Sequence, residues 1–316
     1  MNTTKPAKRD FRIMTDFNRD ELHEIFSIAS ALKKNPEDYR TALAGKTMAM
    51  INEKQSLRTK VTFEAGIQQL GGYSIYLTNQ DINLGKREPV KDVARNLSRW
   101  IDLIVARVYE QETIMELAQY SSVPVINALS DEGHPCQVVA DLFTLWERRE
   151  QNSLERFNLT FIGDGNNVCN SLILIAGLLG FHLTVCTPEG YEPNPKMTWQ
   201  GREMSHDWGG AITFELDPIK AVANADAIYT DVWTSMGQEE ETKKRQFAFK
   251  DYQVNEALLK QAPSHAVVMH CLPAHRGEEI TEGVIESERS IVFDQAENRL
   301  HTQKAIMKFL VDNSPR

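Results

Sequence analysis

The 316-residue chain has few cysteines, no long apolar run and no excess of basic residues. Its four cysteines are widely spaced without a C-x-x-C pair, which excludes a disulfide framework or structural zinc motif and favours a reducing, cytoplasmic compartment. No stretch approaches the roughly 18 to 20 apolar residues of a membrane span. The net charge of -9 argues against nucleic acid or an anionic membrane as partner. Any anionic ligand must therefore be held by a local cluster of Arg and Lys.

Short apolar runs alternate with longer amphipathic ones, which is typical of βαβ units around a mostly parallel sheet. The length favours two domains. We therefore predict an α/β fold of two doubly wound parallel-sheet domains linked by long helices. In the first half, the predicted strands are 46–52, 72–77, 103–106 and 124–127, and the predicted helices are 20–33, 60–70, 89–101 and 112–120. In the second half, the predicted strands are 158–163, 182–186, 227–231, 267–270 and 291–293.

A long helix is predicted over residues 134–149, because Val138, Leu142 and Leu145 recur at helical spacing and Pro135 suits a first helical turn. We expect this helix to pass from one domain into the other. The stretch 237–250 is rich in Glu and Lys, and it is predicted to be a mobile surface segment with a solvated face.

The segment S-L-R-T, residues 56–59, lies between a predicted strand and a predicted helix. Backbone N–H groups and the positive end of the helix dipole emerge there, so an anion could bind. The plainer alternative is a helix cap beside a surface arginine. In H-P-C-Q, His134 and Gln137 share a face at a helix start, where a donor and an amide could grip a planar carbonyl compound. The alternative there is a structural histidine.

Three further motifs follow predicted strands of the second half. G-D-G-N-N at 163–167 invites a dinucleotide-binding interpretation, but the third small residue of G-x-G-x-x-G is missing, which disfavours a dehydrogenase. D-V-W-T-S-M-G at 231–237 and H-C-L-P-A at 270–274 lie where ligands collect in parallel sheets, outside the carboxyl ends of the strands. The candidate residues there are Asp231, Ser235, Met236, Cys271 and Leu272.

These motifs, in this order, resemble the aspartate/ornithine transcarbamylase superfamily, and the last two resemble its ornithine carbamoyltransferase branch. The likeness continues through Arg107 to A-E-N-R-L-H-T-Q-K-A at 296–305. It implies transfer of the carbamoyl group of carbamoyl phosphate to the side-chain amine of L-ornithine, giving L-citrulline and phosphate. No metal or other cofactor is implied. The implied setting is arginine biosynthesis, although either direction of the reaction fits the sequence.

The resemblance also implies the domains and the roles of residues. Carbamoyl phosphate would bind to residues 1–147 with a C-terminal helix of about 300–316 packing back on them, and ornithine to residues 148–299. The implied carbamoyl phosphate ligands are Ser56, Leu57, Arg58, Thr59, Arg107, His134, Gln137, Cys271, Leu272 and Arg299. The implied ornithine ligands are Asn167, Asp231, Ser235 and Met236, and the implied catalytic residues are Arg58, Arg107, His134, Asp231 and Cys271.

Carbamoyl transfer requires residues of these types. Attack on the carbamoyl carbon places negative charge on its oxygen, which fixed donors such as Arg58, Arg107 and His134 would stabilise. Ornithine must attack as a neutral amine, although such amines have a reference pKa of about 10.4. Cys271 with Asp231 is the expected proton relay.

Three positions depart from the family pattern. Leu57 and Lys60 interrupt the S-T-R-T-R of many relatives, and Pro89 stands where many ornithine enzymes have serine. Proline in this loop is similar to the N-succinylornithine branch, so N-succinylornithine, N-acetylornithine and putrescine stay open as alternative acceptors. A non-catalytic anion-binding protein is the distant alternative. The resemblance implies a homotrimer whose shared active sites receive Lys86 and Arg87 from the neighbouring chain.

Overall fold

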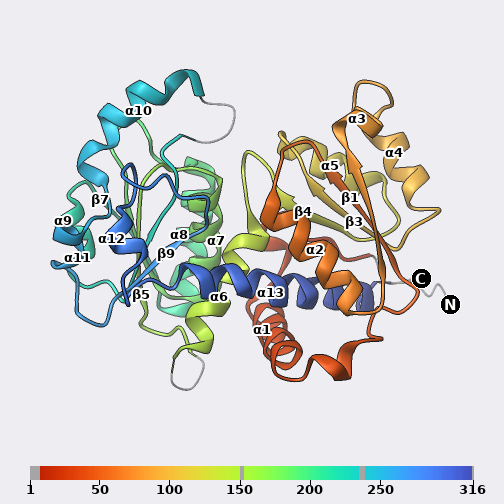
Figure 1. The fold of residues 1–316 in the computed structure, drawn as a ribbon, viewed down its shortest axis with the longest axis horizontal. Coiled ribbons are helices and arrows are strands. Elements are labelled where there is room, and N and C mark those ends of the chain that lie inside the picture. The colour runs from red at the N-terminus through yellow and green to blue at the C-terminus, as the bar shows by residue number, and fades with distance from the viewer. Residues whose placement is uncertain (1–7, 150–152, 235–238, 315–316) are drawn as a thin grey trace. The chain divides into compact units, whose positions relative to one another are not determined.

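The computed structural model describes residues 8–149, 153–234 and 239–314. The chain divides into two compact units, the first made of residues 1–143 and 298–316 and the second of residues 144–297. Each unit is built on one parallel sheet that carries helices (Figure 1). The predicted α/β fold of two parallel-sheet domains is therefore confirmed.

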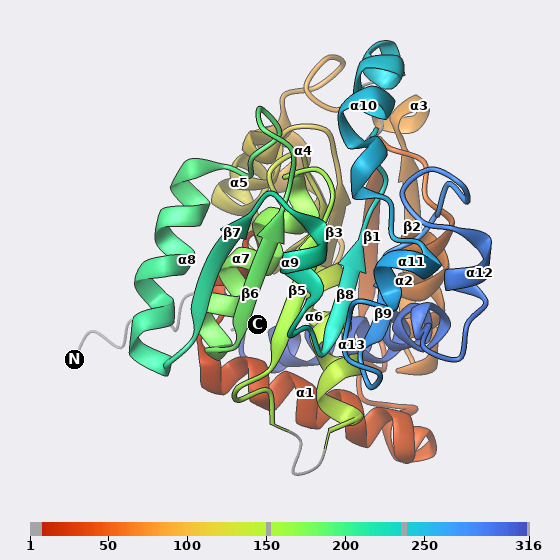
Figure 2. The same cartoon turned by 90° about the vertical axis from the view of Figure 1, so that its left-hand side faces the viewer.

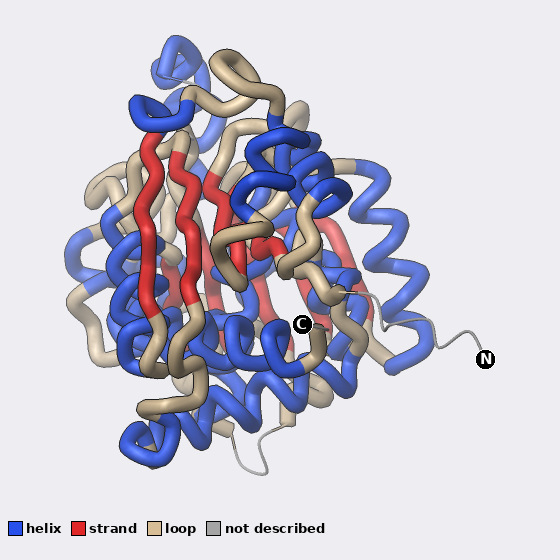
Figure 3. Tube along the Cα trace, turned by 90° about the vertical axis from the view of Figure 1, so that its right-hand side faces the viewer, coloured by secondary structure: helices blue, strands red, loops and turns tan. Residues whose placement is uncertain are grey.

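The sheet of the first unit has four parallel strands in the order β2-β1-β3-β4 (Figure 3). Both central strands are buried along nearly their whole length, as expected where helices cover both faces of a parallel sheet. β2 forms an edge and is partly exposed. The strands are β1 Thr47–Asn52, β2 Tyr73–Thr78, β3 Leu103–Arg107 and β4 Val125–Leu129.

The helices of the first unit include a C-terminal one that lies beside α1 and α2 (Figure 1). On the α2 side, Gly66 permits the close approach, because a Cβ there would lie 3.1 Å from the Lys304 Cγ. On the α1 side, the Lys33 ammonium donates to the Asn298 side chain at 2.9 Å. The helices are α1 Arg19–Lys34, α2 Leu57–Gln69, α3 Asn79–Ile82, α4 Val90–Leu97, α5 Gln111–Tyr120 and α13 Val292–Asp312.

The sheet of the second unit has five parallel strands in the order β7-β6-β5-β8-β9 (Figure 2). α7 and α8 pack together against β6 and β7, while α9 contacts β5, β6 and β7. The strands are β5 Asn158–Ile162, β6 His182–Cys186, β7 Ala211–Glu215, β8 Ala227–Thr230 and β9 Val267–His270. The helices are α7 Asn167–Leu179, α8 Pro195–Trp208, α9 Pro218–Val222, α10 Thr242–Phe249, α11 Glu256–Leu259 and α12 Glu282–Ile285.

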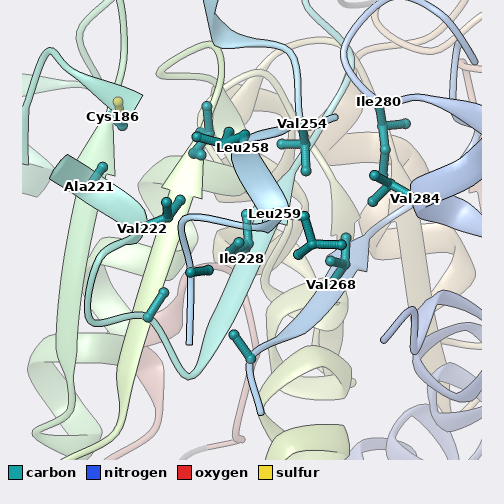
Figure 4. Packing of buried hydrophobic residues seen from close by; sticks show 14 of the residues in the cluster. Cys186, Ala221, Val222, Ile228, Val254, Leu258, Leu259, Val268, Ile280 and Val284 are labelled. Carbon is teal, nitrogen blue, oxygen red and sulfur yellow. The ribbon is translucent and has the colours of Figure 1, made fainter. Parts of the chain in front are cut away.

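A buried apolar cluster joins α9, α11 and α12 to the strands of this sheet (Figure 4). Val222 of α9, Leu259 of α11 and Val284 of α12 belong to it, together with Ile228 and Val268 of the strands. This core fixes the strand ends on which the candidate residues of the second unit stand.

The predicted linking helix is present as α6, Pro135–Glu147, and the boundary between the two units falls within it, after Phe143. None of the helices in the described residues has the length and apolar character of a membrane span.

One predicted strand was wrong. Residues 291–293 form no strand, because α13 begins at Val292 and only Ser290 makes an isolated bridge, to Val268. A three-residue apolar run does not distinguish a strand from the first turn of a buried helix. In the stretch 237–250, the predicted solvated face is confirmed, because Lys243 and Lys244 are exposed. Residues 239–249 form a 3-10 turn and α10, in which Arg245 and Phe249 are buried. Residues 237–238 lie outside the described residues.

The edge strand β7 was not predicted at all. Its sequence A-I-T-F-E has no continuous apolar run, and Thr213 and Phe214 are exposed. The pattern that identifies a buried parallel strand is therefore missing at β7.

Candidate active site

The S-L-R-T segment follows β1, with Ser56 at the N-cap of α2 and residues 57–59 in its first turn. The Ser56 side chain caps α2 by accepting from the Thr59 N–H at 3.1 Å. Thr59 is fully buried, and its hydroxyl accepts from the Arg299 guanidinium of α13 at 3.0 Å. The first turn of a helix leaves backbone N–H groups without helical partners, so an anion can bind there. The motif thus joins a helix N-terminus to an arginine from the far end of the chain.

The two departures from the family motif face away from this cap. Leu57 exposes 74% of its surface. The Lys60 ammonium lies 3.8 Å from the centroid of the Tyr76 ring, on the edge strand β2. This cation–π contact gives Lys60 a role in the local packing of α2 against β2.

Arg107 is the last residue of β3 and is only 8% exposed. Its Nε donates to the carbonyl oxygen of Lys54 at 3.2 Å. Lys54 is itself buried, with its ammonium 4.7 Å from the centroid of the Tyr109 ring. Burial, and secondarily the Arg107 charge, lower the pKa of Lys54. Our sequence analysis missed Lys54, although its place two residues before Ser56 was a usable signal.

His134 lies buried at the start of α6, and its environment is strongly cationic. Burial, followed by the charges of Arg299, Arg107 and Arg58, lowers its pKa well below the usual range of histidine. The imidazole is therefore neutral near pH 7 and can donate one N–H. Such a donor beside three guanidinium groups suits an oxygen on which negative charge develops.

Gln137 provides a hydrogen-bond acceptor on the same helix. Its Nε2 donates to the Asp141 carboxylate at 2.8 Å, and both side chains are buried. Its Oε1 is buried and has no hydrogen-bond partner among the described residues. Asp141 therefore orients the amide so that its oxygen can accept from a ligand N–H. Sequence analysis missed Asp141, although its i+4 spacing from Gln137 was a signal.

In the second unit, Asp231 follows β8 and connects three motifs. Its Oδ1 accepts from the Cys271 thiol at 2.9 Å and from the Val232 N–H at 2.8 Å. Its Oδ2 accepts from the Asn166 side chain at 2.7 Å. Asn166 also caps α7, of which the predicted residue Asn167 is the first. Sequence analysis missed Asn166 and selected only its neighbour.

The H-C-L-P segment is held by a buried histidine. His270 Nδ1 accepts from the Leu272 N–H at 2.9 Å, so its Nε2 carries the hydrogen that is donated to Glu279 at 2.9 Å. Leu272 has a φ of +58°, an uncommon value for a residue with a side chain. The contacts of His270 therefore hold the Leu272 backbone, and with it the predicted carbonyl ligand, in one orientation.

Ligand atoms of Asp231, His270 and Cys271 lie within 4.8 Å of one another, which is close enough to hold a metal ion. The hydrogen bonds already described occupy these same atoms. These atoms therefore already have hydrogen-bond partners within the protein, without an ion.

Ser235 and Met236 lie outside the described residues, but the segments on either side of them are connected. Arg245 of α10 donates to the Trp233 carbonyl oxygen at 3.0 Å and to the Glu241 carboxylate at 3.1 Å. Its guanidinium also forms a buried ion pair with Asp164 at 2.9 Å. Burial raises the pKa of Asp164 to about 6, against the opposing charge of Arg245.

The loop before α4 carries the residues expected to reach a neighbouring chain. Lys86 and Arg87 are exposed, and Arg87 donates to the Asp81 carbonyl oxygen at 3.3 Å. Pro89 occupies the N-cap position of α4.

The predicted residues thus fall into two groups, one in each unit. Among those of the first unit, His134 lies within the electrostatic influence of Arg58, Arg107 and Arg299, and Thr59 is bonded to Arg299. Ser56, Leu57 and Gln137 belong to this unit as well. Among those of the second unit, Asp231 contacts Cys271 directly. Asn167 follows Asn166, which is bonded to Asp231. Leu272 follows Cys271, and its N–H is bonded to His270.

Comparison with known proteins finds two family models, one over each half of the chain. Residues 9–147 match the model of the aspartate/ornithine carbamoyltransferase carbamoyl-P binding domain, and residues 155–310 match that of the Asp/Orn binding domain. The ornithine carbamoyltransferase of Archaeoglobus fulgidus is 52% identical over 298 residues, covering 93% of this chain and 94% of that protein. The one from Anoxybacillus flavithermus is 46% identical over 306 residues and covers 96% of both.

Solved structures lead to the same family. The ornithine carbamoyltransferase from Pyrococcus furiosus superposes with a TM-score of 0.91 at 46% identity, covering 95% of this chain and 96% of that one. The anabolic enzyme from Campylobacter jejuni gives a TM-score of 0.91 at 38% identity, covering 97% and 100%. The arginine-rich site of the first unit and the Asp231–Cys271 pair of the second thus stand in a chain that belongs to the aspartate/ornithine carbamoyltransferase family.

Proposed function

We propose that this enzyme transfers the carbamoyl group of carbamoyl phosphate to the side-chain amine of L-ornithine, producing L-citrulline and phosphate. The observation that carries the proposal is the group of buried donors in the first unit, in which Arg299 is bonded to Thr59 at the start of α2, and His134 and Arg107 are buried as well. A doubly charged phosphate and a carbonyl oxygen that gains charge both need such fixed donors. The names of the relatives, several of them called ornithine carbamoyltransferase, support ornithine as the acceptor.

Carbamoyl phosphate would bind with its phosphate at the N-terminus of α2, held by Ser56, Thr59, Arg58 and the backbone of Leu57. The site of His134, Arg107 and Arg299 would receive the carbamoyl oxygen. The acceptor atoms for the carbamoyl NH2 group would be the Gln137 Oε1 and the Leu272 carbonyl oxygen, with Cys271 beside them. The support for this orientation is that the Gln137 amide nitrogen is already bonded to Asp141, which leaves its oxygen for the ligand.

Ornithine would be recognised at both of its α-substituents. A carboxylate has about four acceptor positions, and the described residues use three of those of Asp231, which leaves a position for the α-ammonium group. Asn167, Ser235 and the backbone of Met236 would hold the α-carboxylate. Cys271, bonded to Asp231, would help to remove the proton from the side-chain ammonium.

In the proposed reaction, one bond to the carbamoyl carbon forms and one breaks. The neutral amine nitrogen forms a bond to the carbamoyl carbon, and the bond from that carbon to the phosphate oxygen breaks. The proton that the attacking nitrogen loses passes to solvent or to the departing phosphate. Arg58, Arg107 and His134 stabilise the charge on the carbonyl oxygen during this step, by a few kcal/mol for each donor.

Within the part of the chain that the structure describes, no feature favours an N-acylated acceptor. Pro89, the residue that raised this alternative, stands at the N-cap position of α4 with a φ of −57°, which its ring allows. The start of α4 thus accommodates this proline.

We also propose a homotrimer in which Lys86 and Arg87 of one chain approach the phosphate site of the next. Exposed apolar side chains on α2 and β2 support an assembly through the first unit, namely Leu57, Val61, Tyr73 and Ile75. Light scattering should give three times the chain mass of 35.9 kDa. We propose a cytoplasmic location, supported by four cysteines that are all free thiols.

The direct test is a citrulline assay with the purified enzyme, carbamoyl phosphate and L-ornithine. Citrulline should form only with both substrates. Gln137→Glu, which keeps the side-chain size but adds charge to the acceptor atom, should raise the KM for carbamoyl phosphate. Gln68→Glu, at a residue of α2 outside the site, should leave it unchanged. Absence of citrulline from the folded wild-type protein would refute the proposal.

A further inference from the structure

A cavity lies in the first unit, apart from the residues assigned to carbamoyl phosphate. It has a volume of about 440 Å³, which falls within the range of small-molecule sites. The end of α1, the 3-10 helix Pro36–Tyr39, the end of α2 and one residue of α13 line it. Its lining includes Leu32, Pro36, Tyr39, Gln69, Leu70 and Lys304.

Lys304 gives this cavity a buried positive charge. The residue is only 2% exposed, and its ammonium donates to the Gln69 side-chain oxygen at 3.0 Å. An ammonium group has three N–H donors, so two are left. Among the described residues, Lys304 forms no ion pair with a carboxylate. The acidic residue of the cavity wall, Glu37, is instead paired with Arg40 at the surface.

The packing of α13 against α2 covers the side-chain stem of Lys304. Its Cγ lies 3.1 Å from the position of a Cβ added at Gly66. A buried ammonium without a counter-ion is costly, and burial accordingly lowers the pKa of Lys304. An anion in the cavity would remove this cost.

The rest of the wall indicates what kind of anion fits. Leu32, Pro36 and Leu70 supply apolar surface next to the ammonium. Arg40 also lines the cavity, but its guanidinium is paired with Glu37, so the Lys304 ammonium is the cation that a ligand would meet. An ammonium acts as a point charge, without the planar fork that favours phosphate in an arginine site. A ligand with one carboxylate and a short apolar body satisfies both features.

We propose that this cavity is a binding site for a small organic carboxylate, whose charged group pairs with Lys304 and whose apolar part lies against Leu32, Pro36 and Leu70. The site is separate from the reaction, because the proposed chemistry uses no residue of its wall. It shares α13 with Arg299, which lies five residues earlier on the helix.

Hexanoate is the probe, and 1-hexanol is its uncharged match. Binding is followed by methyl NMR of the full chain, with inorganic phosphate present to occupy the anion site at α2. Hexanoate should shift the methyl resonances of Leu32 and Leu70 in a saturable manner, and hexanol should bind at least about tenfold more weakly. Equal binding of the two probes, or no saturable shift at these methyl groups, would overturn the proposal.

Two variants test the role of the charge. Lys304→Met keeps the unbranched stem but removes the ammonium, and it should weaken hexanoate binding at least about tenfold. Lys308→Met is the matched control, since Lys308 lies one turn further along α13 and pairs with Asp312. It should bind hexanoate like the wild type. Hexanoate affinity unchanged in Lys304→Met would contradict the proposal, and if that variant fails to fold, the comparison of hexanoate with hexanol on the wild type decides.

Discussion

At the scale of single residues, the charge state of His134 follows from its surroundings. Burial and three arginines depress its pKa, whereas the same side chain in the unfolded chain has a pKa near 6.5. Below about pH 6.5, the unfolded chain therefore binds a proton that the folded one does not. Folding stability should fall with decreasing pH in this window, by up to about 1.4 kcal/mol per pH unit from this residue.

The measurement is the free energy of unfolding at several pH values for the wild type and His134→Gln. The variant should lose the part of the pH dependence that lies below about pH 6.5. His265→Gln, at an exposed histidine paired with Asp226, is the control and should retain it. An identical pH slope in His134→Gln and the wild type would show that His134 is not held neutral.

The arginines of the site should matter more for rate than for folding. Arg107→Ala removes a donor from the developing negative charge, so turnover should fall by about two to four orders of magnitude. Arg58→Ala should act similarly. Arg95→Ala is the matched control, because this guanidinium pairs with Asp92 on the exposed face of α4. Near-normal turnover in Arg58→Ala or Arg107→Ala would remove that residue from the site.

At the scale of elements, Arg245 connects both ends of the segment that carries Ser235 and Met236. It is bonded to Trp233 before the segment and to Glu241 after it, and its ion pair with Asp164 is buried. Arg245→Met should raise the KM for ornithine about tenfold or more, because the segment loses these contacts and Asp164 loses its partner. Steady-state kinetics would measure this change.

The same variant should leave the KM for carbamoyl phosphate nearly unchanged, since Arg245 belongs to the second unit. Arg202→Met serves as the control, because its guanidinium lies over the Phe214 ring at the sheet edge. An equal rise of both KM values in Arg245→Met would indicate general disruption and contradict a positioning role.

Sequence patterns predicted elements and sites to different extents. Central strands such as β1 and β3 were predictable because burial on both faces requires a continuous apolar run. The edge strand β7 and the start of α13 were not predictable, since the sequence of neither shows an apolar pattern that identifies the element. Motif residues such as Ser56 and His134 were predictable because they stand in short contiguous segments of sequence.

Residues that orient these motifs were missed for a different reason. Asn166 is bonded to Asp231 across 65 positions of sequence, and Arg245 to the still more distant Asp164. Such pairs arise only when the strands are placed side by side. Lys54 and Asp141 stand close to predicted residues, but only their burial shows that they belong to the site.

At the scale of the whole molecule, the proposed anion site belongs to the first unit and the proposed amino-acid site to the second. The choice of acceptor would depend on groups that pair with both α-substituents of ornithine. Putrescine lacks the carboxylate, and N-succinylornithine and N-acetylornithine replace the ammonium by a neutral amide. Buried groups left without partners in this way can reject an analogue by about 10⁴-fold.

The most direct test of this account is a citrulline-type assay of one enzyme preparation with carbamoyl phosphate and each acceptor in turn. We predict that kcat/KM is highest for L-ornithine, and lower by several orders of magnitude for putrescine, N-acetylornithine and N-succinylornithine. A higher kcat/KM for any of these three than for L-ornithine would contradict the assignment of the acceptor.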